Sequence, residues 1–206
     1  MAPARRGHGT NHGTYTPDET RRVLLEASMR LFEQNGYHAT SVEAIVSAAG
    51  VTKGAFYHHF AGKEDVLHQI QEDYIELRLS NCQRIVAETG DPVDQLRQLI
   101  GEALYGIEKY RSQVAIFMQE RRFLVGERFA AIKEQRDAVD ALYVNVLRRG
   151  VEEGAFRSDL NPRLATFSIL GMCAWASTWY QQDGTMSISD IAKEMADLVI
   201  QGLVPR

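Results

Sequence analysis

Apolar side chains recur at intervals of three and four residues along most of the chain, and no stretch alternates as a β-strand would. The first such pattern opens at Thr16-Pro17, a capping residue followed by a proline suited to the first helical position. It ends at Asn35-Gly36. The same spacing returns in every later segment, broken at Gly90-Asp91-Pro92, Asn161-Pro162 and Asp183-Gly184. The sequence therefore predicts an all-α protein.

Residues 40–63 contain two short helical patterns separated by a turn. Thr40 and Glu43 have the spacing of a capping box, which makes Thr40 the expected cap of the first helix. Gly50 supplies the turn, and Thr52 is placed to cap the second helix. Two short helices joined in this way form a helix-turn-helix, the motif that places its second helix in the major groove of DNA.

The second of these helices has two different faces. Phe56 and Phe60 lie four residues apart and are expected to face the core. The opposite face carries a cation, a small residue, a phenol and an imidazole, namely Lys53, Gly54, Tyr57 and His58. Lys53 and Tyr57 suit phosphate oxygens, and Gly54 allows a close backbone approach to DNA. The alternative is a small helical hairpin with an aromatic core and a solvated polar face.

This face offers no Arg or Asn for bidentate reading of a base. Sequence preference would then come from the close approach at Gly54, from the nearby hydroxyls of Ser41 and Thr52, or from DNA shape. The motif thus predicts DNA binding and leaves the operator sequence open.

The run from Thr40 to Lys63-Glu64 resembles the DNA-binding signature of the TetR family of bacterial transcriptional regulators. The small pair before the turn, the Tyr-x-x-Phe and the trailing Lys-Glu arrive in register, while Phe56 stands where Leu is more usual. The resemblance covers roughly residues 17–67. It implies an all-helical homodimer that binds a palindromic operator and releases it when a small molecule binds the larger C-terminal domain. It also implies phosphate contacts from Thr40, Lys53, Tyr57, His58 and Lys63.

The last two predicted helices are the expected dimer interface. Small residues recur at every third position of the penultimate helix, at Ala165, Ser168, Gly171, Ala174 and Ser177. Such a ridge lets a second helix approach closely. The final helix, from Ser187, carries a stripe close to a heptad. Two helices from each subunit would form a four-helix interface, and ordinary packing within one chain is the alternative.

A ligand pocket is expected between the helices of the C-terminal region. Trp175 and Trp179 lie on one helical stripe and either line this pocket or fill core or interface volume. Arg121 belongs to a charged cluster between apolar residues, and it either faces solvent or meets an anionic part of a ligand. The candidate ligand-binding residues are Tyr105, Phe117, Arg121, Phe123, Tyr143, Trp175 and Trp179.

A second, looser resemblance concerns the effector. Residues 152–162, 170–175 and 179–180 are similar to TetR-like regulators of fatty-acid or sterol catabolism that sense acyl-CoA thioesters, although relatives with other ligands share the Glu-Gly-x-Phe-Arg-x-Asp element. It implies a repressor released by an acyl-CoA or a similar amphipathic effector. The alternatives are an efflux-type repressor that senses an aromatic or cationic drug-like compound, and a DNA-binding protein without ligand.

Composition and charge narrow these possibilities only slightly. The 206 residues carry a net charge of −4, but residues 1–60 hold six basic and five acidic side chains, together with five of the six histidines. A local basic face can bind phosphates because screening limits electrostatic interactions to about 8–10 Å. We expect residues 1–15 to be a disordered arm, 16–62 the DNA-binding domain, and 63–206 the ligand-binding and dimerisation domain.

Several functional classes have no support in the sequence. No apolar run is long enough for a membrane span or resembles a secretory signal, so a cytoplasmic protein is expected. Cys82 and Cys173 form no disulfide or metal framework. No Gly-x-Ser-x-Gly elbow, phosphate-binding loop or His-Glu-x-x-His occurs. We therefore expect no enzymatic activity, no cofactor and no metal site.

Overall fold

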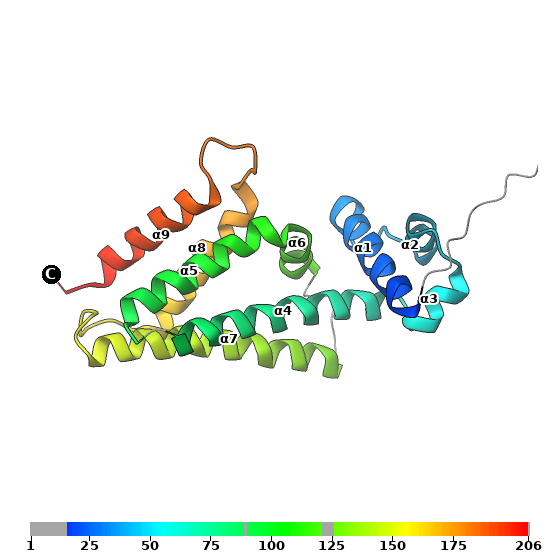
Figure 1. The fold of residues 1–206 in the computed structure, drawn as a ribbon. Coiled ribbons are helices and arrows are strands. Elements are labelled where there is room, and N and C mark those ends of the chain that lie inside the picture. The colour runs from blue at the N-terminus through cyan, green and yellow to red at the C-terminus, as the bar shows by residue number, and fades with distance from the viewer. Residues whose placement is uncertain (1–15, 89, 121–125, 206) are drawn as a thin grey trace, which may run out of the picture. The chain divides into compact units, whose positions relative to one another are not determined.

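The computed structural model describes residues 16–88, 90–120 and 126–205, and it describes only the backbone of residues 120, 126, 128 and 129. Every regular element within these ranges is a helix, which confirms the predicted all-α class (Figure 1). The helices are α1 Pro17–Asn35, α2 Val42–Ala49, α3 Lys53–His59, α4 Lys63–Glu88, α5 Pro92–Lys109, α6 Arg111–Glu120, α7 Gly126–Glu152, α8 Pro162–Trp179 and α9 Ile188–Leu203.

The chain divides into two compact units, the first ending at Leu67 and the second beginning at His68. The division falls inside α4, five residues beyond the boundary expected after residue 62. A single helix therefore contributes residues to both units. None of the helices in the described ranges is both long and apolar enough to cross a membrane.

The helix-turn-helix begins one residue later than the capping pattern predicts. Ser41, not Thr40, caps α2, because its Oγ accepts a hydrogen bond from the Ala44 N–H at 3.1 Å. Thr40 is buried, and its hydroxyl donates to the Gly36 carbonyl at 2.9 Å. The Leu31 carbonyl lies 3.2 Å from the same hydroxyl. Thr40 thus contacts a carbonyl near the end of α1 and the carbonyl of its C-cap residue.

In the first unit α1 packs against both α2 and α3. The core between them contains Leu24, Ile45, Phe56 and Phe60, all at most 3% exposed. The turn between α2 and α3 is made by Gly50, whose φ of 68° lies in the left-handed region. Thr52 caps α3 as predicted, accepting from the Ala55 N–H at 3.1 Å. The fold of this unit leaves the opposite face of α3 to solvent.

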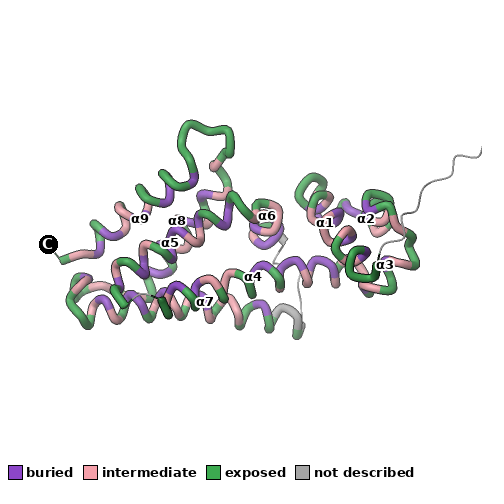
Figure 2. Tube along the Cα trace, in the orientation of Figure 1, coloured by how far each residue is buried: buried purple, intermediate pink, exposed green. Residues whose placement is uncertain are grey.

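In the second unit α5 is the central helix and packs against α6, α7, α8 and α9. Its inner stripe, which includes Leu96, Ile100 and Leu104, is fully buried (Figure 2). Tyr143 of α7 lies in the same core, and its hydroxyl donates to the Leu99 carbonyl at 2.6 Å. This unit therefore has a packed core built around α5.

Candidate nucleic-acid interface and internal cavity

The predicted recognition face of α3 is exposed in the structure. Lys53, Gly54, Tyr57 and His58 are all exposed, and Tyr57 keeps 52% of its surface. A Cβ added at Gly54 would meet only the Thr52 Oγ1, at 3.8 Å, so the backbone there is open to a close approach. The buried side chains of Phe56 and Phe60 fix the rotation of the helix. The structure thus brings these four residues together on one surface.

Lys53 forms an ion pair with Glu43 of α2. The hydrogen bond from Lys53 lowers the pKa of the Glu43 carboxyl, and the same contact raises the pKa of Lys53. The Lys53 and Glu43 side chains are 55% and 64% exposed, so the pair lies in water and contributes little to stability. A phosphate group can therefore compete with Glu43 for the Lys53 ammonium.

Lys63, for which the family resemblance implies a phosphate contact, binds backbone carbonyls in this structure. Its ammonium donates to the carbonyls of Tyr37, His38 and Thr40 at 2.9, 3.1 and 2.9 Å. The ammonium also lies 4.6 Å from the centroid of the Tyr37 ring, within the range of a cation–π contact. Three carbonyls match the three donors of an ammonium. Lys63 therefore links the start of α4 to the segment that connects α1 with α2.

The other predicted DNA-binding residues differ in exposure. Ser41 and Thr52 are exposed while their oxygens cap α2 and α3. Thr40 is only 2% exposed. Its predicted phosphate contact would require the buried hydroxyl to leave its carbonyl partners. The predicted arm, residues 1–15, lies outside the described residues.

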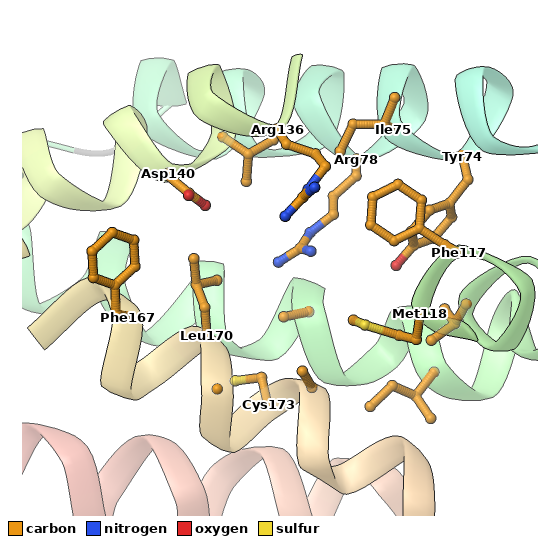
Figure 3. Close-up of a pocket in the computed structure, with 16 residues that line it drawn as sticks. Tyr74, Ile75, Arg78, Phe117, Met118, Arg136, Asp140, Phe167, Leu170 and Cys173 are labelled. Carbon is orange, nitrogen blue, oxygen red and sulfur yellow. The ribbon is translucent and has the colours of Figure 1, made fainter. Parts of the chain in front are cut away.

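The second unit contains a partly open cavity of about 360 Å³ (Figure 3). Its walls come from α4, α5, α6, α7 and α8. Apolar side chains such as Ile75, Phe117 and Leu170 form much of the lining. Arg78 of α4 and Arg136 of α7 bring two guanidinium groups to it, and Asp140 of α7 adds a carboxylate. The cavity is thus apolar with a small number of charged groups, as ligand sites commonly are.

The charged groups that line the cavity lie close to a further carboxyl group, that of Glu102. The Nε of Arg78 lies 3.7 Å from Oε2 of Glu102, a residue of α5 that lines a neighbouring surface groove. Burial raises the pKa of the Glu102 carboxyl, while Arg78 opposes this rise. Burial also raises the pKa of Asp140, and the nearby Arg136 and Arg78 again oppose the rise. Two cations and two carboxyl groups therefore share this part of the unit.

The structure separates the predicted ligand-binding residues. Phe117 lines the cavity, and its ring packs edge-on against Tyr74 at 5.2 Å. Tyr143 lies in the core without lining the cavity, and Tyr105 lines the separate groove between α4, α5 and α9. Trp175 and Trp179 are 67% and 47% exposed and do not line the cavity either. Arg121 and Phe123 lie outside the described residues.

Sequence reasoning missed the charged groups of the cavity, Arg78, Arg136 and Asp140. On long helices rich in Glu and Arg they resemble ordinary surface residues. One signal was present for Arg78. It follows Tyr74 and Ile75 by four and three residues, so it shares their buried stripe. Within the described ranges no three His, Cys, Asp or Glu side chains are grouped as metal ligands would be.

A helix-turn-helix with an exposed polar recognition face, followed by a separate helical unit with a cavity between its helices, defines a class of DNA-binding regulators. Comparison with protein families agrees with this class. Residues 24–70 match the family described as bacterial regulatory proteins, tetR family, and residues 89–203 match the Tetracyclin repressor-like C-terminal domain. The chain belongs to the TetR family and is a DNA-binding transcriptional regulator.

Individual relatives cover nearly the whole chain. The HTH-type transcriptional repressor KstR2 of Rhodococcus jostii is 34% identical over 185 residues, which are 89% of this chain and 90% of that protein. The structure of the ketosteroid transcriptional regulator KstR2 of Mycobacterium tuberculosis has a TM-score of 0.85 at 29% identity, covering 90% of this chain and 95% of that one. AibR, solved in complex with isovaleryl coenzyme A and operator DNA, has a TM-score of 0.80 at 27% identity, covering 87% and 97%.

Proposed function

We propose that this protein is a homodimeric repressor that binds a palindromic operator and is released from it by an amphipathic effector, namely an acyl-CoA thioester. The observation that carries the proposal is the cavity, because its wall includes α4, the helix whose first residues belong to the DNA-binding unit. A ligand that favours one arrangement of α4 over another would change the affinity for DNA. Only such differential binding can shift the equilibrium.

The exposed face of α3 supports the DNA-binding half of the proposal. Lys53, Tyr57 and His58 offer a cation, a hydroxyl and an imidazole to phosphate groups. Two such helices in a dimer read successive major grooves about 34–36 Å apart, so the operator is expected to be a palindrome. We propose that Ser41, Thr52 and Gly54 contribute at the edge of the same interface. Lys63 acts indirectly, by holding the segment that connects α1 with α2.

The surface of α8 and α9 supports a homodimer. Large apolar side chains are exposed there, namely Leu164, Phe167, Trp175, Trp179 and Leu198. An apolar groove between the two helices, lined by Leu164, Ala165, Ser168 and Leu198 among others, runs along this surface. Exposed apolar surface of this kind marks an interaction site, and two helices per subunit give the four-helix interface expected from the sequence.

The ridge of small residues on α8 serves two surfaces. Residues three apart rotate by 300° around a helix, so the row drifts around α8 from Ala165 to Ser177. Ala165 and Ser168 line the groove against α9, whereas Gly171 and Ala174 line the cavity. The helix proposed for the dimer interface therefore also forms a wall of the cavity, which offers a second route from effector to operator affinity.

The cavity favours an amphipathic effector over the alternatives. At about 360 Å³ it lies at the lower end of ligand pockets, enough for an acyl group but not for a whole coenzyme A. The nucleotide would remain outside. The two arginines of its lining disfavour a cationic drug-like compound, because the nearby carboxyl groups of Asp140 and Glu102 already face these arginines. A DNA-binding protein without ligand would have no need of such a cavity. The complex of AibR with isovaleryl coenzyme A provides a precedent among similar structures.

An operator can be selected from a random double-stranded library, and release from it followed by fluorescence anisotropy. We expect acyl-CoA thioesters to release the protein in a manner that depends on acyl chain length, while free coenzyme A does not. The double variant Lys53→Ala, Tyr57→Ala should lose affinity and show a shallower salt dependence. Unchanged affinity in that variant would refute the docking of α3. Release by an unrelated apolar compound alone would refute the acyl-CoA effector.

A further inference from the structure

Arg78 is the most unusual polar side chain of the cavity. It lines the cavity while its side chain is only 14% exposed. Among the described residues, its Nε has no hydrogen-bond partner. The Glu102 carboxylate, 3.7 Å away, is within ion-pair range but too distant for a hydrogen bond. Because Nε is itself covered by protein, the donors that can reach a ligand in the cavity are the N–H groups of the two terminal guanidinium nitrogens.

The surroundings of Arg78 favour contact with a ligand. Figure 3 shows the guanidinium extending from α4 into the cavity, between Phe117 of α6 and the α8 side chains Leu170 and Cys173. These neighbours are apolar or, for Cys173, a thiol whose pKa burial raises to about 11. None of the three competes strongly for the guanidinium donors. An oxygen atom on the buried part of an effector would be the natural acceptor.

Charge balance indicates which kind of oxygen. The cations Arg78 and Arg136 are matched by the carboxyl groups of Asp140 and Glu102. A carbonyl oxygen would add no charge to this set. A carboxylate would add one, and it would be tolerated only if Glu102 or Asp140 took up a proton. Burial raises the pKa of both carboxyl groups, so one of them can take up a proton when a carboxylate binds. A neutral acceptor is favoured because it requires no such protonation.

We propose that Arg78 determines effector specificity by donating hydrogen bonds to an acceptor oxygen on the acyl part of the ligand, with a keto carbonyl favoured over a carboxylate. This inference rests on the proposed function, because it assumes that the cavity receives the acyl group. Glu102 acts as a positioning residue, because its carboxylate forms an ion pair with the Arg78 guanidinium. An effector with a plain hydrocarbon chain leaves the buried donors unpaired and binds more weakly.

The test compares CoA thioesters of one chain length. Hexanoyl-CoA, 3-oxohexanoyl-CoA, 5-oxohexanoyl-CoA and adipoyl-CoA are titrated against the protein–operator complex and, separately, against free protein by calorimetry. We expect at least one oxo thioester to release the operator at about tenfold lower concentration than hexanoyl-CoA, since a site built to donate hydrogen bonds rejects analogues that lack the acceptor. Arg78→Met should bring this ratio close to one while hexanoyl-CoA still acts.

Two further variants control for folding and general electrostatics. Arg78→Lys keeps a charge beside Glu102 and should fold, yet it should lose most of the preference because an ammonium lacks the guanidinium fork. Arg84→Met removes an exposed arginine of the same helix, whose side chain is 60% exposed, and should leave the preference unchanged. Thermal unfolding monitored by circular dichroism verifies that each variant is folded before its titration.

Each outcome decides the inference. A preference for adipoyl-CoA that disappears in both Arg78 variants overturns the keto acceptor and leaves only Arg78 as the specificity residue. Equal action of all four thioesters on the wild type, or a preference that survives in both Arg78 variants, overturns it. No action by any thioester overturns it together with the proposed acyl-CoA effector. Failure of the wild type to bind any selected DNA would instead contradict the proposed repressor function, so the failures can be distinguished.

Discussion

Lys63 and Tyr37 make two contacts at once. The Lys63 ammonium lies 4.6 Å from the centroid of the Tyr37 ring and donates to the Tyr37 carbonyl at 2.9 Å. The carbonyls of His38 and Thr40 accept the remaining hydrogen bonds. The first residue of α4 thereby fastens the connection between α1 and α2, and with it the N-terminus of α2. This makes Lys63 a structural residue of the DNA-binding unit.

Replacing Lys63 with Met should destabilise the protein without removing a phosphate contact. The change leaves three carbonyls without their charged donor. A hydrogen bond to a charged group is worth about 1.5–3 kcal/mol, but the Lys63 ammonium is partly solvated and the freed carbonyls can bind water. We therefore expect the free energy of unfolding to fall by only about 1–2 kcal/mol. Urea denaturation measures the loss. The salt dependence of operator binding should keep its slope.

Lys53→Met is the matched comparison, because it removes an exposed cation from α3. It should lower the slope of log affinity against log salt by about one unit while stability stays nearly unchanged. If Lys63→Met lowered the slope as much as Lys53→Met, Lys63 would have to leave its carbonyls and contact phosphate in the complex.

Glu43→Gln should strengthen operator binding. In the free protein the Glu43 carboxylate pairs with the Lys53 ammonium. A DNA phosphate must therefore displace the carboxylate before it can contact Lys53. Neutralising Glu43 removes this competition and also removes a negative charge near the DNA. We expect an affinity increase of about two- to fivefold at low salt, the range typical of exposed ion pairs. Anisotropy titrations at several salt concentrations measure it, and a decrease in affinity would show that Glu43 supports the interface.

Tyr143→Phe should separate a core role from a ligand role. The Tyr143 hydroxyl is buried and donates to the Leu99 carbonyl at 2.6 Å, and the residue does not line the cavity. We expect the variant to lose about 1 kcal/mol of stability, the typical net value of such a bond. Effector concentrations for half release should match those of the wild type. A change of several fold in them, at unchanged operator affinity, would restore the ligand role predicted from the sequence.

The DNA-binding face could be predicted because its information is local. Phe56 and Phe60 share one helical stripe, so the periodicity alone assigned Lys53 and Tyr57 to the exposed side. The predicted cap of α2 was one residue too early, because Thr40 and Ser41 both carry a hydroxyl that can cap a helix. Thr40 turns inward because its hydroxyl binds the carbonyls of Leu31 and Gly36, contacts that the capping pattern does not include.

A pocket between the C-terminal helices was expected, but its charged lining could not be predicted because it depends on contacts between distant segments. Arg78, Arg136 and Asp140 meet only after α4 and α7 have packed in the second unit. Aromatic residues attracted attention in the sequence, yet Trp175 and Trp179 are large side chains suited equally to a pocket and to an interface. The structure leaves both exposed on α8. The sequence shows which residue types are available to a pocket, whereas helix packing decides which of them line it.

Leu198→Glu should break the proposed dimer. Leu198 is 67% exposed on α9 and lines the apolar groove between α8 and α9, where a charge would have to be buried on association. We expect light scattering to show the mass falling from a dimer to the single chain of 23.2 kDa. Operator affinity should fall by about 10²-fold or more, because two half-sites are no longer bound by linked units. Folding of the isolated chain is verified by circular dichroism.

Leu77→Glu is the matched control, since Leu77 is also an exposed leucine, at 37%, but lies on α4 beside the groove shared with α5 and α9. This variant should remain dimeric and bind the operator normally. A Leu198→Glu protein that stays dimeric while Leu77→Glu dissociates would move the interface to the α4 groove. The exposed Trp175 and Trp179 would then need another role, and the link between the cavity wall on α8 and the partner subunit would be lost.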